Sequence, residues 1–209
     1  MIVTDLNALA SPRVVGRPNR DGGQAEAARR ILEVAAPMFY GQGLRAVSAD
    51  AVIDAAGVTK ATFYRHYPSK DDLVVAYLRT VSDAERHVLN EWRSQHPGDP
   101  SRVLERYARA VGTQARGPEF RGCPFLNAIA AYPEREHPVR VAAEEHRAWL
   151  RSCATDLLTE MGARHAGLVS VQLVMLRDGA MATGEDVPPR RVTQALLSAG
   201  SALLRAARA

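Results

Sequence analysis

The side chains that could do chemistry in this chain gather in one short segment, residues 59–70. The segment carries Lys60, Arg65 and Lys70 and contains no Asp or Glu. Lys60 and Lys70 are also the only two lysines among the 27 basic residues of the chain. Because lysine is a compact, flexible point charge and arginine a planar fork, the two are not equivalent at a crowded phosphate or base edge. Cations that neutralise phosphates supply most of the affinity of proteins for nucleic acid, so DNA binding is the first hypothesis; the alternative is a coincidence of composition.

Local signals place this segment on the second of two short helices. Ser48 is a candidate N-cap for a first helix that runs to about Ala56. Gly57 can adopt the left-handed conformation that ends it, and Thr59 can cap the next helix. That helix ends near Tyr67, because the following proline disfavours helical geometry before it. Two short helices joined by a glycine turn predict a helix-turn-helix over residues 48–67.

The second short helix divides into a packing side and a reading side. At 100° per residue, Phe63 and Tyr67 fall on one face. The residues that project around the other are Ala61, Thr62, Tyr64 and Arg65. The wider segment 24–73 has no net charge. The positive charge that could attract a polyanion such as DNA is therefore confined to residues 59–70, which we call the reading edge.

Helical periodicity continues through the rest of the chain and predicts an all-α fold with no strand. Expected helices cover residues 24–40, with Pro37 inside, then 70–92, 100–114, a short helix from 124, 138–161, 165–183 and 190–207. We interpret residues 1–23 as a flexible arm, 24–68 as an N-terminal three-helix DNA-binding domain and 69–209 as a larger helical bundle. The arm could hook into a minor groove, but a solvated tail is the simpler interpretation.

Several function classes find no support in the sequence. Glu144, Glu145 and His146 are consecutive, so they splay around a helix, and no metalloprotease or nucleophile-elbow spacing occurs. We therefore expect neither catalysis nor a cofactor nor a metal site. The two cysteines form no metal-like pair, although Cys123 at a helix start could sense oxidants. No apolar run approaches the roughly 20 residues of a membrane span, and no secretory signal is evident, so we expect a cytoplasmic protein.

The run from Ala56 to Leu73, AGVTKATFYRHYPSKDDL, closely resembles the signature of the TetR family of bacterial transcription regulators. The resemblance covers about residues 28–78 and includes ILEVA at 31–35 and the break at 41–43. It implies an all-helical fold with three DNA-binding helices and a larger bundle for dimerisation and ligand binding.

The resemblance also implies roles for individual residues in binding double-stranded DNA. Those expected to face base edges are Lys60, Ala61 and Thr62. Those expected to bind phosphates, which orient a protein without reading sequence, are Ser48, Tyr64, His66 and Lys70. Each could instead be structural: a cap, a core contact or a contact with the first helix. Asp50 departs from the family, in which many members carry a basic side chain there; it could accept from cytosine or favour the helix N-terminus.

The last two helices are candidates for a homodimer interface. A short recognition helix contacts few base pairs, so specificity normally needs two copies on a pseudo-palindromic site. The helix over 165–183 is apolar nearly all round, as expected of a helix buried on two sides. The residues assigned to the interface are Leu168, Met175, Val192, Leu196, Ala199 and Leu203. The alternative is that this stripe only closes the core of the monomer.

The resemblance finally implies a pocket for a small molecule of unknown identity. The candidate lining residues are Tyr107, Phe125, Asn127, His146 and Trp149, each of which could instead belong to the core. The predicted function is a sequence-specific DNA-binding regulator, a repressor released from its operator when the small molecule binds. The alternative is a ligand-independent repressor or an architectural DNA-binding protein.

Overall fold

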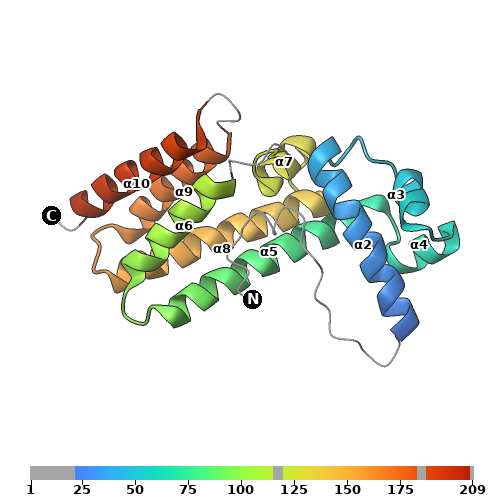
Figure 1. The fold of residues 1–209 in the computed structure, drawn as a ribbon, viewed down its shortest axis with the longest axis horizontal. Helices are drawn as coiled ribbons and strands as arrows, with labels where there is room; N and C mark the ends of the chain where they lie inside the picture. Colours follow the sequence, from blue (N-terminus) through green and yellow to red (C-terminus); the bar gives the residue numbers. More distant parts are fainter. Residues whose placement is uncertain (1–21, 115–119, 183–186, 208–209) are drawn as a thin grey trace. The chain divides into compact units, whose positions relative to one another are not determined.

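A computed structural model describes residues 22–114, 120–182 and 187–207, and within these ranges every regular element is an α-helix (Figure 1). The bounds of the helices are α2 Gly22–Gln42, α3 Ala49–Ala56, α4 Lys60–His66, α5 Lys70–Gln95, α6 Pro100–Gln114, α7 Pro124–Ala131, α8 Pro138–Glu160, α9 Ala166–Ala182 and α10 Pro189–Ala206. The all-α prediction is confirmed. In the described part of the chain, no helix is long and apolar enough to cross a membrane.

The chain divides into two compact units. Of the described residues, one unit combines 22–84 with 124–144, and the other combines 85–114, 120–123, 145–182 and 187–207. The first unit is therefore larger than the predicted 24–68 DNA-binding domain, because it also holds the first half of α5, all of α7 and the start of α8. We call the first the reading unit and the second the bundle unit. The predicted arm 1–23 lies almost wholly outside the described residues.

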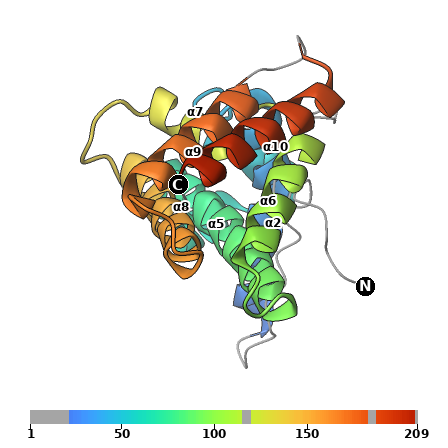
Figure 2. The ribbon, with the colours of Figure 1, turned by 90° about the vertical axis from the view of Figure 1, so that its left-hand side faces the viewer.

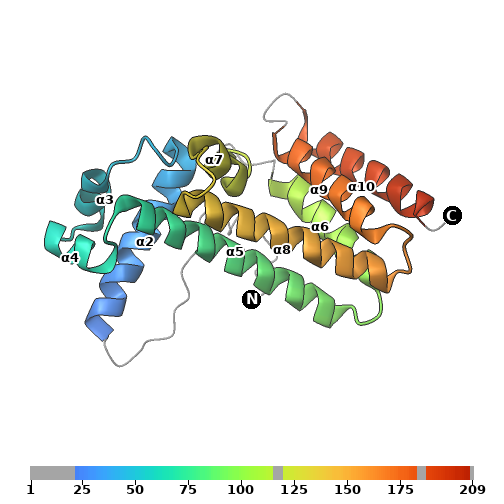
Figure 3. The same cartoon turned by 180° about the vertical axis from the view of Figure 1, so that it is seen from behind.

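The reading unit is organised around α2, which lies beside α3 and α4 (Figure 3). Its core contains Ile31 and Phe39 from α2, Val52 from α3 and Phe63 from α4, all at most 1% exposed. The hydroxyl of Tyr67 donates a hydrogen bond to the backbone oxygen of Ala28, 3.1 Å away. As the helical spacing predicts, Phe63 and Tyr67 attach the second short helix to α2. Helix α2 continues through Pro37 to Gln42.

The bundle unit is held together where α6, α9 and α10 lie side by side (Figures 1 and 2). Gly112 makes the approach of α6 to α10 possible, since a Cβ atom there would lie 2.0 Å from Oγ1 of Thr193. An apolar cluster of Leu158, Val169 and Ala207 lies where the last turn of α8, the first turn of α9 and the residue after α10 come together. Removing these side chains from water favours the packed bundle.

Candidate functional site

The turn between α3 and α4 has the geometry that the sequence predicts. Ser48 Oγ accepts from the backbone N–H of Ala51 at 3.1 Å, and Thr59 Oγ1 accepts from that of Thr62 at 3.1 Å. Gly57 has a φ of +61°, and its N–H donates to the carbonyl oxygen of Asp54. The two hydroxyls thus bind backbone N–H groups at the starts of α3 and α4, and the glycine turn binds a carbonyl oxygen at the end of α3; a helix leaves such groups without partners of its own.

The predicted base-facing residues form the exposed N-terminal turn of α4. Ala61 is exposed, and the half-buried Thr62 shares a hydrogen bond of 2.9 Å with the Thr59 hydroxyl. Lys60 Nζ lies 2.9 Å from Asp50 Oδ1, with both side chains more than 60% exposed. The hydrogen bond to Asp50 and its negative charge raise the pKa of Lys60, so the amine stays protonated. Asp50, the departure from the family pattern, thus has Lys60 as a partner.

The four predicted phosphate-binding residues differ in what they contact. Ser48 is exposed but its hydroxyl serves as the cap of α3, while Tyr64 is 46% exposed and meets the ring of Phe63 edge-on. His66 is half-buried. Lys70 Nζ donates to the backbone oxygens of Leu44 at 2.9 Å and Arg45 at 3.4 Å. The ammonium of Lys70 therefore ties the start of α5 to the loop before α3, and a role at phosphate stays a prediction.

A group of contacts that sequence reasoning missed lies beside this loop, within the reading unit. The Tyr132 hydroxyl donates to Asp71 Oδ1 at 2.8 Å, and Nε2 of His137 lies 3.4 Å from Asp71 Oδ2. The Arg45 guanidinium lies 4.6 Å from the centre of the Tyr132 ring, and its Nε donates to the oxygen of Ala131. Burial, together with the hydrogen bond to Asp71, raises the pKa of Tyr132.

We call Arg45, Asp71, Tyr132 and His137 the Tyr132 clamp. Its members come from the loop before α3, the start of α5 and the segment after α7. The clamp therefore fixes the loop that leads into the helix-turn-helix. Only long-range contacts reveal it, because its members are separated by up to 92 positions in the sequence.

The bundle unit contains a cavity of about 290 Å³. Its walls are mainly apolar and come from α5, α6, α8, α9 and α10. Apolar side chains that line it include Leu89, Val103, Leu104, Ala108, Val111, Leu150, Leu157, Val174, Leu196 and Leu204. Ser101, Glu105, Cys153, Arg177 and Ser201 also line it. A mostly apolar cavity with a few polar groups is the usual form of a small-molecule site.

Of the five predicted ligand residues, Tyr107 lines this cavity. His146 is buried beside Glu85, and Trp149 is half-buried with the Arg86 guanidinium 4.3 Å above its ring. Phe125 and Asn127 lie on α7 in the reading unit, where Phe125 is buried in the core and Asn127 is exposed. Helical spacing cannot distinguish a side chain that lines a cavity from one that fills a core, which is why the prediction gathered both kinds.

A buried polar cluster adjoins the cavity. The Tyr107 hydroxyl donates to Glu85 Oε1 at 2.7 Å, and Arg177 Nε donates to the Tyr107 oxygen at 3.3 Å. Nε2 of His146 lies 3.4 Å from Glu85 Oε2, and Arg177 Nη1 lies 2.9 Å from the sulfur of Cys123. Burial alone would raise the pKa of Glu85, but the contact with His146 and the charge of Arg177 hold it below its ordinary value. Burial lowers the pKa of His146.

The residues assigned to the dimer interface separate into two groups. Leu168 and Met175 are 61% and 67% exposed, and Val171 between them is 41% exposed. These three side chains follow one face of α9, together with the exposed Gly167, Gly179 and Ala182. On α10, by contrast, Val192 and Leu196 are buried within the protomer, Ala199 is half-buried, and Leu203 packs against the cluster of Leu158, Val169 and Ala207.

Comparison with known proteins identifies some relatives over the helix-turn-helix segment and others over most of the chain. Residues 31–77 match the family model described as bacterial regulatory proteins of the tetR family. The transcriptional repressor KstR2 of Mycobacterium tuberculosis is 38% identical over 71 residues, which are 34% of this chain and 32% of that protein. The transcriptional activator FasR of Mycolicibacterium smegmatis is 34% identical over 193 residues, 88% of this chain and 83% of that protein. The match with KstR2 therefore spans about a third of its length, whereas the match with FasR spans most of both chains.

A solved structure agrees with these relatives. A TetR-family transcriptional regulator from Streptomyces coelicolor has a TM-score of 0.81 and 38% identity, covering 88% of this chain and 97% of that one. A TetR transcription regulator from Haloarcula marismortui, at 15% identity and a TM-score of 0.73, shares the fold. The chain belongs to the TetR family.

Proposed function

We propose that this protein is a DNA-binding transcription repressor that acts as a homodimer and leaves its operator when a small molecule occupies the cavity of the bundle unit. The observation that carries the proposal is the capped α3–α4 pair, which presents Lys60, Ala61 and Thr62 on an exposed helix start. A helix-turn-helix places the N-terminal residues of its second helix against base edges in the major groove. The proposal includes that the protein is soluble in the cytoplasm and that it catalyses no reaction.

Selection of bound duplexes from a random pool tests the DNA-binding part. The full chain should enrich a two-fold symmetric motif whose half-sites are about one helical turn apart, or a multiple of that. Recovery of no motif, together with strongly salt-dependent binding to every duplex, would favour the architectural alternative. Transcription from a promoter carrying the motif then separates repression from activation, since the relatives include a named repressor and a named activator.

The dimer part rests on the exposed apolar face of α9. Leu168, Val171 and Met175 recur at helical spacing on one side of the helix, and such a patch usually marks an interface. Glycine and alanine beside them allow two helices to approach closely. Met175→Glu should convert a dimer to a monomer in sedimentation equilibrium, because the introduced carboxylate would be buried in the interface. Val141→Glu is the matched control, since Val141 is a 39% exposed apolar residue on α8 of the reading unit.

The release part rests on the cavity and on the family. A ligand weakens DNA binding only if it binds the DNA-free conformation more tightly than the DNA-bound one. A compound that binds the full chain should therefore weaken its binding to the selected duplex. If compounds that bind the cavity leave operator affinity unchanged, the ligand-independent repressor is the better description.

A further inference from the structure

The cavity in the bundle unit is elongated along α6. Its lining begins at Ser101 and ends at Val111, a span of about 15 Å at the rise of an α-helix. Ser101 on α6 and Ser201 on α10 are exposed, so the cavity reaches solvent at this end. Val111, at the other end, is 1% exposed. The cavity therefore suits a long molecule that enters beside the start of α6.

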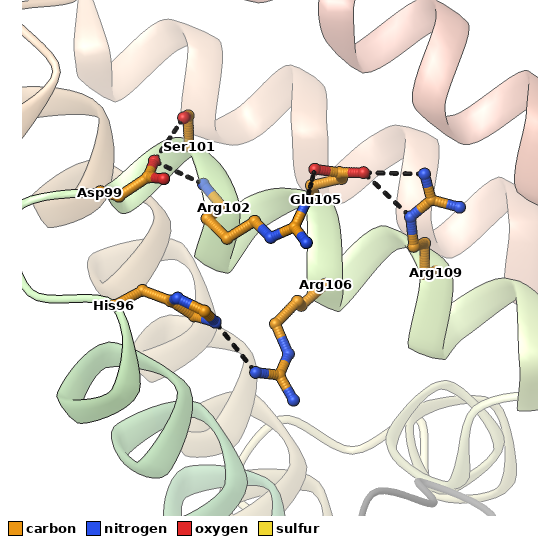
Figure 4. Close-up of polar contacts among 7 residues, drawn as sticks. All are labelled: His96, Asp99, Ser101, Arg102, Glu105, Arg106 and Arg109. Carbon is orange, nitrogen blue, oxygen red and sulfur yellow. Dashed lines mark hydrogen bonds and ion pairs between the residues drawn. The ribbon is translucent and has the colours of Figure 1, made fainter.

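The two carboxylates at this entrance are already engaged by neighbouring groups, and Arg102, Arg106 and Arg109 surround them (Figure 4). Glu105, which lines the cavity, binds Arg102 at 2.9 Å and Arg109 at 2.7 Å. The hydrogen bond from Arg109, together with Arg102, lowers the pKa of Glu105. Asp99 accepts hydrogen bonds from the Ser101 hydroxyl and the backbone N–H of Arg102. Both carboxylates of the rim are thus engaged, and neither is left to attract a cationic ligand.

Arg177 is the cation that lines the cavity, and it is 7% exposed. Its Nε donates to the Tyr107 oxygen, and its Nη1 contacts the Cys123 sulfur and, at 3.1 Å, Asp178 Oδ1. Among the described residues, Nη2 makes no hydrogen bond, and the nitrogen is not fully enclosed by protein atoms. A guanidinium donor beside a largely apolar cavity favours a ligand that brings an acceptor, because a ligand without one would displace water from the donor and leave it unpaired, which costs free energy.

The charges around Arg177 are balanced without a ligand. Arg177 and Arg147 are the cations, and the carboxylates are Glu85 and Asp178, with Arg147 Nη2 2.6 Å from Asp178 Oδ2. A further cation, Arg86, lies over the Trp149 ring and does not line the cavity. Burial lowers the pKa of His146, which favours its neutral form. A carboxylate ligand would therefore add a buried negative charge without a spare cation, and an amine would add a positive charge beside Arg177. Either addition carries a desolvation cost that a neutral molecule avoids.

We propose that this cavity binds an elongated, uncharged, mainly apolar molecule whose one oxygen acceptor, a carbonyl or hydroxyl, takes a hydrogen bond from Arg177 Nη2. The inference rests on the proposed function in that this molecule is the one that releases the operator. The apolar walls supply affinity, and Arg177 favours a molecule with a carbonyl or hydroxyl oxygen over a hydrocarbon of the same length. Arg177 should distinguish poorly between a ketone and an alcohol, because both offer an acceptor.

Four probes of equal chain length test the charge preference: 2-decanone, 1-decanol, decanoate and decylammonium, titrated into the full-length protein by calorimetry. The ketone and the alcohol should bind, and the two ions should bind at least about tenfold more weakly, since tenfold corresponds to about 1.4 kcal/mol of differential binding. Decanoate binding as tightly as 2-decanone would overturn the inference. So would the absence of binding by both neutral probes.

Two variants locate the contact. Arg177→Lys keeps the charge that Glu85 and Asp178 need but removes the second guanidinium nitrogen, so 2-decanone should bind several-fold more weakly. Arg151→Lys, at an exposed position of α8, is the matched control and should bind as the parent does. Ala108→Leu places a larger side chain in the cavity and should weaken both neutral probes, whatever Arg177→Lys does to folding. Unchanged binding in Ala108→Leu would contradict this cavity as the site.

A DNA-binding assay with the same probes separates this inference from the proposed function. Loss of binding to the selected duplex on adding 2-decanone supports both. If 2-decanone binds with the stated preference but the duplex stays bound, the chemistry of the cavity is supported and release is contradicted. If the duplex binds and only decanoate or decylammonium releases it, release is supported and the inference is overturned.

Discussion

The ion pair between Lys60 and Asp50 and the cluster around Glu85 and Arg177 use the same kinds of group in opposite environments. The side chains of Lys60 and Asp50 are 68% and 63% exposed, whereas those of Glu85 and Arg177 are 6% and 8% exposed. An exposed pair contributes little to stability and can exchange its partner at small cost. A buried pair cannot lose one member without leaving an uncompensated charge. The first is suited to a contact that DNA replaces, and the second to a fixed frame beside a cavity.

The largest effect should follow removal of the buried carboxylate. Glu85→Ala leaves Asp178 as the only carboxylate for Arg177 and Arg147 in the buried cluster and Tyr107 without its acceptor, so the free energy of unfolding should fall by about 3 kcal/mol. Urea denaturation of the full chain measures the change. Glu145→Ala, at an exposed position of α8, is the control and should stay within about 0.5 kcal/mol of the parent. A loss equal to that of the control would mean that the cluster does not frame the cavity.

The same cluster should make stability fall as pH falls. His146 and Glu85 both have a lower pKa in the folded chain than in the unfolded one, so the unfolded chain binds protons first. Their contributions are complete at neutral pH. They are lost first below about pH 6.5 through His146 and then below about pH 4.5 through Glu85. Urea denaturation across this range should show the first step, and His146→Gln should remove it; a step that persists in the variant would assign it to other groups.

A smaller effect is expected in the Tyr132 clamp, in which the buried Tyr132 contacts the half-buried Asp71 and His137 and the exposed Arg45. Tyr132→Phe removes the hydrogen bond to Asp71, so the free energy of unfolding should fall by about 1 kcal/mol. Tyr64→Phe, which alters an exposed hydroxyl, should be nearly neutral in the same urea denaturation. Equal losses in the two variants would show that the hydrogen bond to Asp71 adds nothing specific.

The smallest effect on stability is expected for the exposed pair. Asp50→Asn should change the free energy of unfolding by no more than about 0.5 kcal/mol. It should nevertheless raise affinity for the selected duplex by about threefold, because it frees Lys60 and removes a negative charge next to the reading edge. Fluorescence anisotropy with labelled duplex measures this. Weaker binding in Asp50→Asn would mean that Asp50 itself contacts DNA, as an acceptor from cytosine would.

The helix-turn-helix could be predicted from sequence because its signals are local. The caps at Ser48 and Thr59 act within three residues of themselves, and Gly57 adopts the conformation that its missing side chain permits. Likewise Phe63 and Tyr67 could be assigned to the packing face from helical spacing alone. The partner of Asp50 could not, because a contact between exposed side chains of two helices depends on how those helices cross.

Features that depend on contacts between residues far apart in the sequence could not be predicted, or were predicted together with residues of another kind. Glu85 and Arg177 are 92 positions apart, and no pattern in either helix indicates that both contact the Tyr107 hydroxyl. An apolar stripe also cannot show what covers it: Val192 and Leu196 are buried in their own protomer, while Leu168 and Met175 face outward. Both pairs are apolar and recur at helical spacing, so only the packed bundle distinguishes them.

The most direct test of the proposed reading edge is base preference in Lys60→Ala. Anisotropy titrations would compare the parent and the variant on the selected duplex and on duplexes with each base pair changed in turn. Lys60→Ala should lose discrimination at particular base pairs, about tenfold at each, while Arg151→Ala, which removes an exposed cation from the bundle unit, should retain it. A uniform loss of affinity on every duplex, or full discrimination without Lys60, would contradict the assignment of α4 as the helix that reads DNA.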